Sequence, residues 1–246
     1  MRLLAQIGVY FLFMRRAFSR PEKFSVFYRQ IMREIDKVGI NSFPIVVIIS
    51  LFVGAVITIQ SNFNIENPLL PRYLVGVTVR DSLLLEFSST MVALILAGKV
   101  GSSVSSELGM MRITEQIDAL EVMGINSVSY LIMPKIIAAV LFFPILCLLS
   151  IIMGLFGGYV ACAVANVLPP ADYIYGIQYA FYPYYIGYAL TKMVFYAVII
   201  TSVSSFYGYH VKGGAVEVGK SSTKAVVQSS ILILLANLIL TKTILQ

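Results

Sequence analysis

The longest stretch without a charged side chain constrains the fold of this chain more than any other feature. No Asp, Glu, Lys or Arg occurs between Lys135 and Asp172, and further runs with few or no charges precede and follow it. About 20 apolar residues are enough for a helix to cross a bilayer. Charged residues make up 12% of the 246 residues, about half the share of an ordinary soluble domain. We therefore expect an all-α polytopic membrane protein with little sequence left for a soluble domain.

Five segments are long and apolar enough to be membrane spans. The second contains Glu86 and is followed directly by Lys99, and the fourth contains Lys192. We expect them to belong to a single membrane domain that includes all residues from 1 to 246. The five expected spans are 43–61, 81–98, 132–164, 184–207 and 223–243.

Residues 1–42 precede the first span and predict helices at the membrane surface. Residues 3–14 are apolar, but twelve residues are too few to cross a bilayer. They favour an interfacial helix in the cytoplasmic leaflet. Residues 20–40 carry apolar side chains at spacings of three and four, which predicts a second, amphipathic helix.

The basic residues indicate how the chain is oriented. Most of the 18 Lys and Arg residues fall in three segments, 1–42, 99–135 and 212–224, which five spans place on the same side. Because Lys and Arg gather on the cytoplasmic side, we expect a cytoplasmic N-terminus and a C-terminus on the opposite side. The net charge of +6 is then explained by orientation, and no nucleic-acid partner is expected.

The polar segment 101–124 joins the second and third spans on the expected cytoplasmic side. Its apolar residues recur at helical spacing, which predicts one amphipathic helix bracketed by Gly109 and Gly124. Anionic lipid repels an acidic helix, so docking into a groove of a soluble partner is favoured, while docking on lipid stays open. The apolar residues are Met110, Ile113, Ile117 and Leu120, and the acidic ones are Glu107, Glu115, Asp118 and Glu121.

A phosphate-loop pattern, G-x-x-x-x-G-K-[ST], is matched by Gly214, Gly219, Lys220 and Ser221. That motif binds phosphate where a strand leads into a helix within a βαβ unit, and the adjacent spans leave no room for one. We interpret the match as a coincidence and expect no nucleotide site in this chain. Gly213 and Gly214 then form a turn, and Ser221, Ser222 or Thr223 caps the fifth span.

Two long stretches resemble the signatures of a known family. AGKVGSSVSSELGMMRITEQIDALEVMGINSVSYLIMPK, residues 97–135, and GYHVKGGAVEVGKSSTKAVVQSS, residues 208–230, are similar to the two signature regions of the MlaE/YrbE family. These are ABC-type permeases that work with MCE (mammalian cell entry) proteins. The resemblance extends over nearly the whole chain.

The resemblance implies a homodimer in a bacterial inner membrane. It implies a cytoplasmic ABC ATPase that binds ATP and Mg²⁺, a periplasmic MCE-domain protein, and phospholipid or a related lipid moved between the inner membrane and the outer envelope. Many members have Arg where this chain has Lys99, which lacks the planar guanidinium fork. The segment around 107–121 corresponds to the coupling helix that the ATPase grips. Its expected contact residues are Glu107, Gly109, Met110, Ile113, Glu115, Ile117, Asp118, Leu120 and Glu121.

The charges expected nearest the hydrocarbon are those of Glu86, Lys99 and Lys192. A charge at the centre of a membrane helix costs about 2.5–3.5 kcal/mol. Such residues either line a path for lipid headgroups or form a polar anchor. For the two lysines, snorkelling to a nearby interface is slightly favoured. For Glu86 we favour a polar cavity or an ion pair.

These observations favour a transport subunit over an enzyme. No Ser/His/Asp set or carboxylate pair stands out, and the single histidine, His210, has no ligand partners at metal-site spacing. We expect a permease that performs no bond chemistry and has no metal or cofactor of its own. The alternatives are a passive scaffold for an MCE protein and an ion-coupled secondary transporter, which would need paired charges within the membrane or inverted repeats; neither is apparent.

Overall fold

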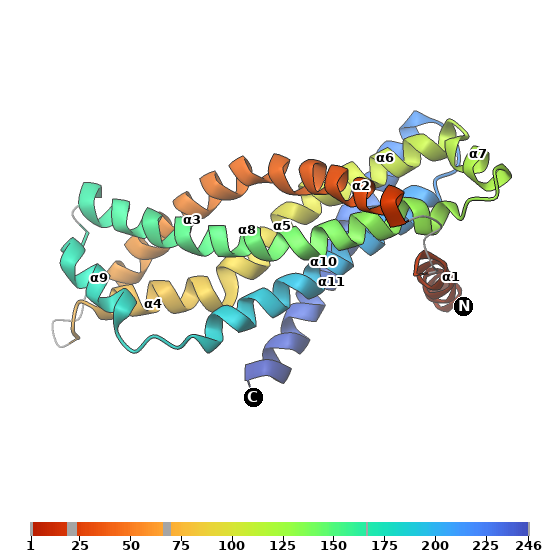
Figure 1. The fold of residues 1–246 in the computed structure, drawn as a ribbon. Coiled ribbons are helices and arrows are strands. Elements are labelled where there is room, and N and C mark those ends of the chain that lie inside the picture. The colour runs from red at the N-terminus through yellow and green to blue at the C-terminus, as the bar shows by residue number, and fades with distance from the viewer. Residues whose placement is uncertain (1, 19–23, 66–69, 166, 246) are drawn as a thin grey trace. The chain divides into compact units, whose positions relative to one another are not determined.

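The computed structural model in Figure 1 describes residues 2–18, 24–65, 70–165 and 167–245. All regular elements within these residues are helical. Five helices are long and apolar enough to cross a membrane, and each contains one of the expected spans. The all-α polytopic architecture is therefore confirmed. The five helices are Val26–Asn64, Leu74–Ile113, Ser127–Ala165, Tyr184–Tyr209 and Ala215–Leu245.

The N-terminal residues form two helical stretches. α1 covers Arg2–Ala17. The second stretch starts as α2 and continues without interruption into the first span, so the expected surface helix and the first span are one helical run. Its parts are α2 (Phe24–Glu34), the π-helix η1 (Ile35–Gly39), the 3₁₀ turn η2 (Ile40–Ser42) and α3 (Phe43–Asn64).

The second span is a helical run with two π-helical parts. A π-helix has a wider turn than an α-helix and is frequent at functional sites. Here the two π-helical parts contain Glu86 and Lys99, which the sequence identified as charges in or next to this span. The parts are α4 (Leu74–Ser82), η3 (Leu83–Met91), α5 (Val92–Leu96), η4 (Ala97–Gly101) and α6 (Ser102–Ile113).

Five further helices follow, three of them long. Pro170 begins the short helix α9, where its fixed φ and missing N–H are tolerated. The five are α7 (Gln116–Val122), α8 (Ser127–Ala165), α9 (Pro170–Gln178), α10 (Tyr184–Tyr209) and α11 (Ala215–Leu245).

The chain divides into two compact units, each built from three segments. The first contains Met1–Ser42, Leu94–Phe143 and Val194–Ile239. The second contains Phe43–Ala93, Pro144–Met193 and Leu240–Gln246. Most of the basic residues that predict the cytoplasmic side belong to the first unit.

Close helix packing defines the second unit. A Cβ at Gly54 of α3 would overlap the carbonyl of Gly154 of α8, and a Cβ at Gly157 would overlap the carbonyl of Leu51. Small residues let membrane helices approach in this way. The hydroxyls of Ser50 and Ser150 hydrogen-bond across the same two helices at 2.8 Å. Glycine at these positions is therefore required by the α3–α8 contact.

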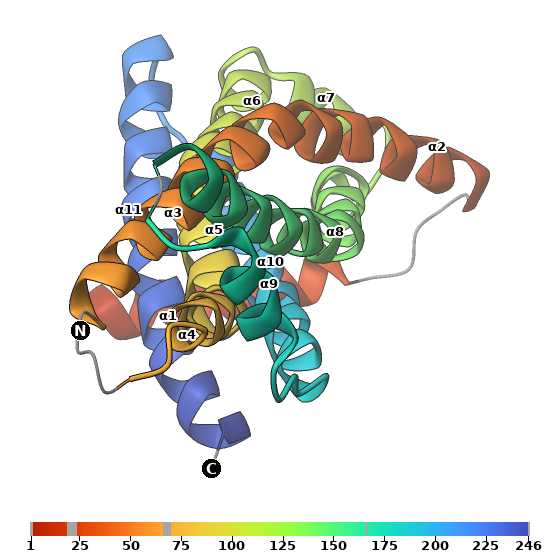
Figure 2. The same ribbon diagram turned by 90° about the vertical axis from the view of Figure 1, so that its left-hand side faces the viewer.

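The short helix α9 lies beside α4 in both views (Figures 1 and 2). Gly76 packs against the backbone of Tyr173 in α9. The guanidinium of Arg80, at the end of α4, is buried and donates to the carbonyls of Ile177 and Tyr179 at 2.9 and 2.6 Å. Arg80 thus satisfies carbonyls that the C-terminus of α9 leaves open.

In the first unit, α1 packs on the end of α10 through aromatic rings. Phe13 is buried against Phe206, Tyr209 and His210, with ring centroids 5.2–5.5 Å apart. The hydroxyl of Tyr10 donates to Ser202 at 2.7 Å. These contacts explain how an N-terminal helix too short to span is held against the rest of its unit.

Candidate functional site

The segment 101–124 forms two helices. α6 ends at Ile113, Glu115 has a left-handed backbone with φ of 60°, and α7 begins at Gln116. The hydroxyl of Thr114 donates to the carbonyl of Met110 at 2.9 Å, a local bond that competes with helix continuation. The single helix expected from the sequence is therefore broken after Ile113, whereas Gly124, with φ of 79°, follows α7 as expected.

The break redistributes the apolar residues that were expected to share one face. Ile117 is fully buried and Ile113 and Leu120 are half-buried, so only Met110 of that set is exposed. Instead, Val122 and Met123 at the end of α7 are 89% and 65% exposed. Sequence periodicity missed these two because they are adjacent residues, not a helical stripe.

Two of the expected contact residues are held inside the first unit. Gly109 is buried, and a Cβ there would press against Val211 and Val218 at 3.0–3.3 Å. The carboxylate of Glu107 binds two ammonium groups, Lys37 at 2.7 Å and Lys135 at 2.6 Å. Both residues therefore determine where α6 lies within the unit.

Lys135 is the centre of this ion cluster. Its side chain is 3% exposed, and it also binds Glu34 of α2 at 2.8 Å. A buried ammonium is tolerated when carboxylates surround it. Sequence analysis uses Lys135 only to orient the chain, because its partners lie 28 and 101 positions away and no local pattern joins them.

The other acidic residues of the segment differ in their surroundings. Glu121 accepts hydrogen bonds from Ser127 and Tyr209 at 2.9 and 2.8 Å, and these bonds lower the pKa of its carboxyl. Asp118 pairs with Arg112 at 2.5 Å. Glu115 is exposed and forms no ion pair with any basic residue that the structure describes.

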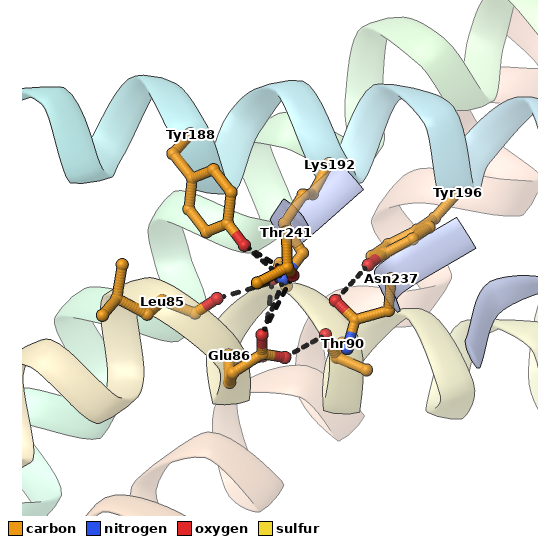
Figure 3. Close-up of polar contacts among 9 residues, drawn as sticks. Leu85, Glu86, Thr90, Tyr188, Lys192, Tyr196, Asn237 and Thr241 are labelled. Carbon is orange, nitrogen blue, oxygen red and sulfur yellow. Dashed lines mark hydrogen bonds and ion pairs between the residues drawn. The ribbon is translucent and has the colours of Figure 1, made fainter. Parts of the chain in front are cut away.

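In the second unit, Glu86 and Lys192 form an ion pair (Figure 3). The Lys192 ammonium lies 3.1 Å from Glu86 Oε1 and also donates to the Leu85 carbonyl. Its side chain is fully buried, so the expectation that Lys192 snorkels to an interface is wrong. Glu86 had been expected in an ion pair or a polar cavity, and its side chain remains 43% exposed.

Hydroxyl groups complete this polar cluster. The Lys192 ammonium donates to the Tyr188 hydroxyl at 3.2 Å. The Tyr188 hydroxyl lies 2.8 Å from the Thr241 hydroxyl. The Thr241 hydroxyl donates in turn to Glu86. Thr90 donates to the second carboxylate oxygen of Glu86 at 3.1 Å. The cluster joins η3, α10 and α11. Tyr188 and Thr90 lie four positions from the charges they contact, a helical spacing that could have found them.

Lys99 has a different partner. Its ammonium donates to the carbonyl of Asn41 in η2, so it connects the π-helical η4 to the segment before the first span. The contact is made to a single carbonyl oxygen, for which a guanidinium fork is not required.

The phosphate-loop letters lie mostly in a helix. Gly214 directly precedes α11, whereas Gly219, Lys220 and Ser221 lie within its first turns. Lys220 pairs with Glu217 at 2.6 Å, and Ser221 donates to the carbonyl of Tyr207. The expected capping by Ser221, Ser222 or Thr223 does not occur, because α11 begins six residues or more earlier.

Metal-binding geometry is not formed by the part of the chain that the structure describes. No group of three or more His, Cys, Asp or Glu side chains there could hold a metal ion. His210 packs among the rings of Phe13, Phe206 and Tyr209.

Residues 31–243 match the profile of the family described as Permease MlaE. The chain belongs to the MlaE permease family. The matched region of this family includes both the segment 101–124 and the Glu86–Lys192 pair, and it begins after α1.

Curated relatives agree with the MlaE assignment. A "Probable ABC transporter permease protein" of Rickettsia bellii is 32% identical over 98% of this chain and 93% of its own length. A protein of the same description from Synechocystis is 33% identical over 86% of this chain and 80% of its own. The "Intermembrane phospholipid transport system permease protein MlaE" of Haemophilus influenzae is 29% identical over 86% and 81%.

Proposed function

We propose that this chain is the membrane subunit of an ABC transporter that moves phospholipid or a related lipid between the inner membrane and the outer envelope. The observation that carries the proposal is the family match across both the segment 101–124 and the Glu86–Lys192 pair. The name of the Haemophilus relative, a phospholipid transport permease, supports the lipid cargo.

The proposed assembly is a homodimer with a separate cytoplasmic ATPase and a periplasmic MCE-domain protein. The N-terminus lies in the cytoplasm and the C-terminus in the periplasm. The concentration of basic residues in 1–42, 99–135 and 212–224 supports this orientation. The apolar part of α11, only 17% buried within the single chain, is consistent with a subunit that works in an assembly.

In this proposal the ATPase grips the exposed end of the segment 101–124. Met110, Val122 and Met123 supply apolar contact, and the exposed carboxylate of Glu115 supplies charge at the edge. Exposed apolar side chains of this kind are frequent at docking sites. Closure of the ATPase on ATP then moves α6 and α7.

The ion cluster around Lys135 transmits this motion. Glu107 lies on α6, Glu34 on α2 and Lys135 on α8, so a shift of α6 acts on two further helices through one buried ammonium. Buried ion pairs resist separation because each unpaired charge would remain in a poorly solvated place. The cluster therefore favours joint movement of the three helices.

The Glu86–Lys192 cluster is the proposed contact for the lipid headgroup. Lys192 is buried and holds the carboxylate, while Glu86 is exposed enough to meet a polar group. Ionisable residues inside spans usually face a cavity or a substrate path. A Glu86→Gln protein that transports lipid at the normal rate would remove the pair from the mechanism.

An ion-coupled transporter is the second candidate, and one observation favours it. Such a protein needs paired charges within the membrane, and Glu86 with Lys192 is such a pair, although none was apparent in the sequence. The passive scaffold is the third candidate, and it requires no energy source.

A transfer assay separates the three candidates. The complex is reconstituted into vesicles that contain fluorescent phospholipid, and lipid release to an MCE-protein acceptor is followed over time. Transfer that requires ATP hydrolysis and is unaffected by ionophores supports the proposal. Transfer abolished by ionophores supports ion coupling, and transfer without either energy source supports the scaffold.

A further inference from the structure

Tyr209, the last residue of α10, contacts both helices of the segment 101–124. Its hydroxyl donates to the carboxylate of Glu121 on α7 at 2.8 Å. The guanidinium of Arg112, near the end of α6, lies over its ring, 5.8 Å from the ring centroid. A hydrogen bond to a charged acceptor and a cation–π contact both depend on where the partner lies. Tyr209 therefore holds α6 and α7 on the two sides of the bend at Glu115.

The start of α8 reinforces the contact with Glu121. The buried hydroxyl of Ser127 lies 2.9 Å from the Tyr209 hydroxyl and donates to the same oxygen of Glu121 at 2.9 Å. The carboxylate of Glu121 is thus fixed by two hydroxyl groups, although its side chain is exposed. Val122 and Met123, the exposed residues proposed to meet the ATPase, follow Glu121 directly. The position of Glu121 therefore determines how these two side chains are presented.

The ring of Tyr209 also packs against α1, within the same unit. Phe13 of α1 is buried, and its ring centroid lies 5.2 Å from that of Tyr209. Aromatic rings at this separation attract each other beyond the effect of the area that they bury. Elsewhere on α1, Phe11 and Leu12 are exposed, as in a helix that lies in a membrane leaflet. One side chain thus contacts both the proposed membrane-surface helix and the proposed ATPase contact.

A cavity reduces the other contacts between α1 and the residues that lead into α8. Its volume is about 580 Å³, and Leu12 and Arg16 of α1 line it together with Asn126 and Val128. The Asn126 amide donates to the Arg16 carbonyl at 3.5 Å, which is longer than an ordinary hydrogen bond. The buried ring contact between Phe13 and Tyr209 is therefore the stronger connection from α1 towards α7.

We propose that Tyr209 is a positioning residue that makes the orientation of α7 depend on the docking of α1. When Phe13 is seated against it, the ring is held and its hydroxyl is directed at Glu121, so Val122 and Met123 are presented to the ATPase. When α1 is displaced, the ring gains freedom and α7 loosens. The proposal rests on the proposed function for the identity of the partner that α7 meets, and it adds α1 as an input to that contact.

The first measurement records the mobility of α7 without any ATPase. The full chain is placed in lipid nanodiscs with a nitroxide spin label on the cysteine introduced by Met123→Cys. Cys147 and Cys162 are buried and should react poorly with the label. Tyr209→Phe keeps the ring and removes the hydroxyl, while Phe13→Leu keeps an apolar side chain and removes the ring. Both variants should make the label more mobile.

Tyr10→Phe is the matched control, because it removes a hydrogen bond between α1 and Ser202 of α10 at 2.7 Å and leaves the contacts of Tyr209 unchanged. It should not alter the spectrum. Adding Phe13→Leu to Tyr209→Phe should change the label little further, because both substitutions break the same connection. Additive changes, an unchanged label in Tyr209→Phe or in Phe13→Leu, or an equal gain of mobility in Tyr10→Phe would overturn the proposal.

The second measurement titrates the ATPase against the same variants without the label. Tyr209→Phe should raise the ATPase concentration needed for half-maximal binding about fivefold, the effect of one lost hydrogen bond. The rate of ATP turnover at saturating ATPase should stay that of the unmodified complex. A lower rate at saturation with an unchanged half-maximal concentration would refute a role in positioning. An ATPase that fails to bind the unmodified chain would contradict the proposed function alone, since the label is measured in its absence.

Discussion

The ammonium nitrogen of Lys135 lies 2.6 Å from Glu107 Oε2 and 2.8 Å from Glu34 Oε1. One buried side chain of α8 thereby joins the segment 101–124 to the helix that leads into the first span. Through this ion cluster, the segment that the ATPase is proposed to grip is connected mechanically to the membrane helices.

Replacing Lys135 with Met should destabilise the first unit. Both carboxylates would lose their buried partner, and breaking a buried ion pair costs about 3 kcal/mol. Thermal unfolding of the purified protein in detergent measures the change. Lys37→Met is the matched control, because Lys37 binds the same Glu107 but is 56% exposed, and an exposed pair contributes about 1 kcal/mol or less. Equal shifts for the two variants would contradict the buried role of Lys135.

Two substitutions of Glu115 separate the effect of its backbone conformation from the effect of its charge. Its left-handed backbone, with φ of 60°, favours glycine, so Glu115→Gly should be more stable than Glu115→Ala by about 1 kcal/mol. Both variants remove the same carboxylate. If the ATPase recognises the charge, both should recover less ATPase in a pull-down. If it recognises the bend between α6 and α7, Glu115→Gly should recover as much as the unmodified protein.

The exposed apolar end of α7 should matter for docking and little for folding. Val122→Asp places a charge where the side chain is 89% exposed, so stability should change by about 0.5 kcal/mol or less. ATPase recovery should fall several-fold because the apolar contact is lost. Val216→Asp is the control, since Val216 is 73% exposed in the first turn of α11. A normal yield of ATPase with Val122→Asp would exclude this end of α7 as the contact.

The hydrogen bonds to Glu121 predict a pH dependence. Donation by Ser127 and Tyr209 lowers the pKa of the Glu121 carboxyl below its usual value of about 4.3. A lowered folded-state pKa contributes stability above the unfolded-state value, and that contribution is lost as the pH falls through the folded-state pKa. Glu121→Gln should therefore be less stable than the unmodified protein at neutral pH. Unfolding curves between neutral pH and pH values below about 4 should converge, and a constant gap would refute the assignment.

The membrane architecture could be predicted from the sequence because hydrocarbon imposes one requirement on long segments. An uncharged run such as 136–171 must form a helix in the bilayer, and the structure places most of it in α8. The positions at which helices break were harder to predict from the sequence. The bend at Glu115 depends on a single backbone conformation, which a helical spacing of apolar residues does not report.

Whether a polar contact could be predicted depended on how far apart its two residues lie in the sequence. Glu86 was singled out because an isolated carboxylate in a span is costly, but its partner Lys192 lies 106 positions away. Without that partner, snorkelling was the simpler interpretation of Lys192. Lys135 was missed as a structural residue for the same reason, since the tertiary fold alone brings Glu34 and Glu107 to it.

The proposed function makes this chain a permease that is driven by ATP bound to another protein. The most direct measurement is a pull-down of the tagged chain in mild detergent, with mass spectrometry and an ATPase assay of the recovered material. We expect a separate ATPase and an MCE-domain protein to be recovered. ATPase activity should survive Lys220→Ala and be lost when the phosphate loop of the partner is mutated. Recovery of the chain alone, with nucleotide binding that Lys220→Ala abolishes, would contradict the proposed function.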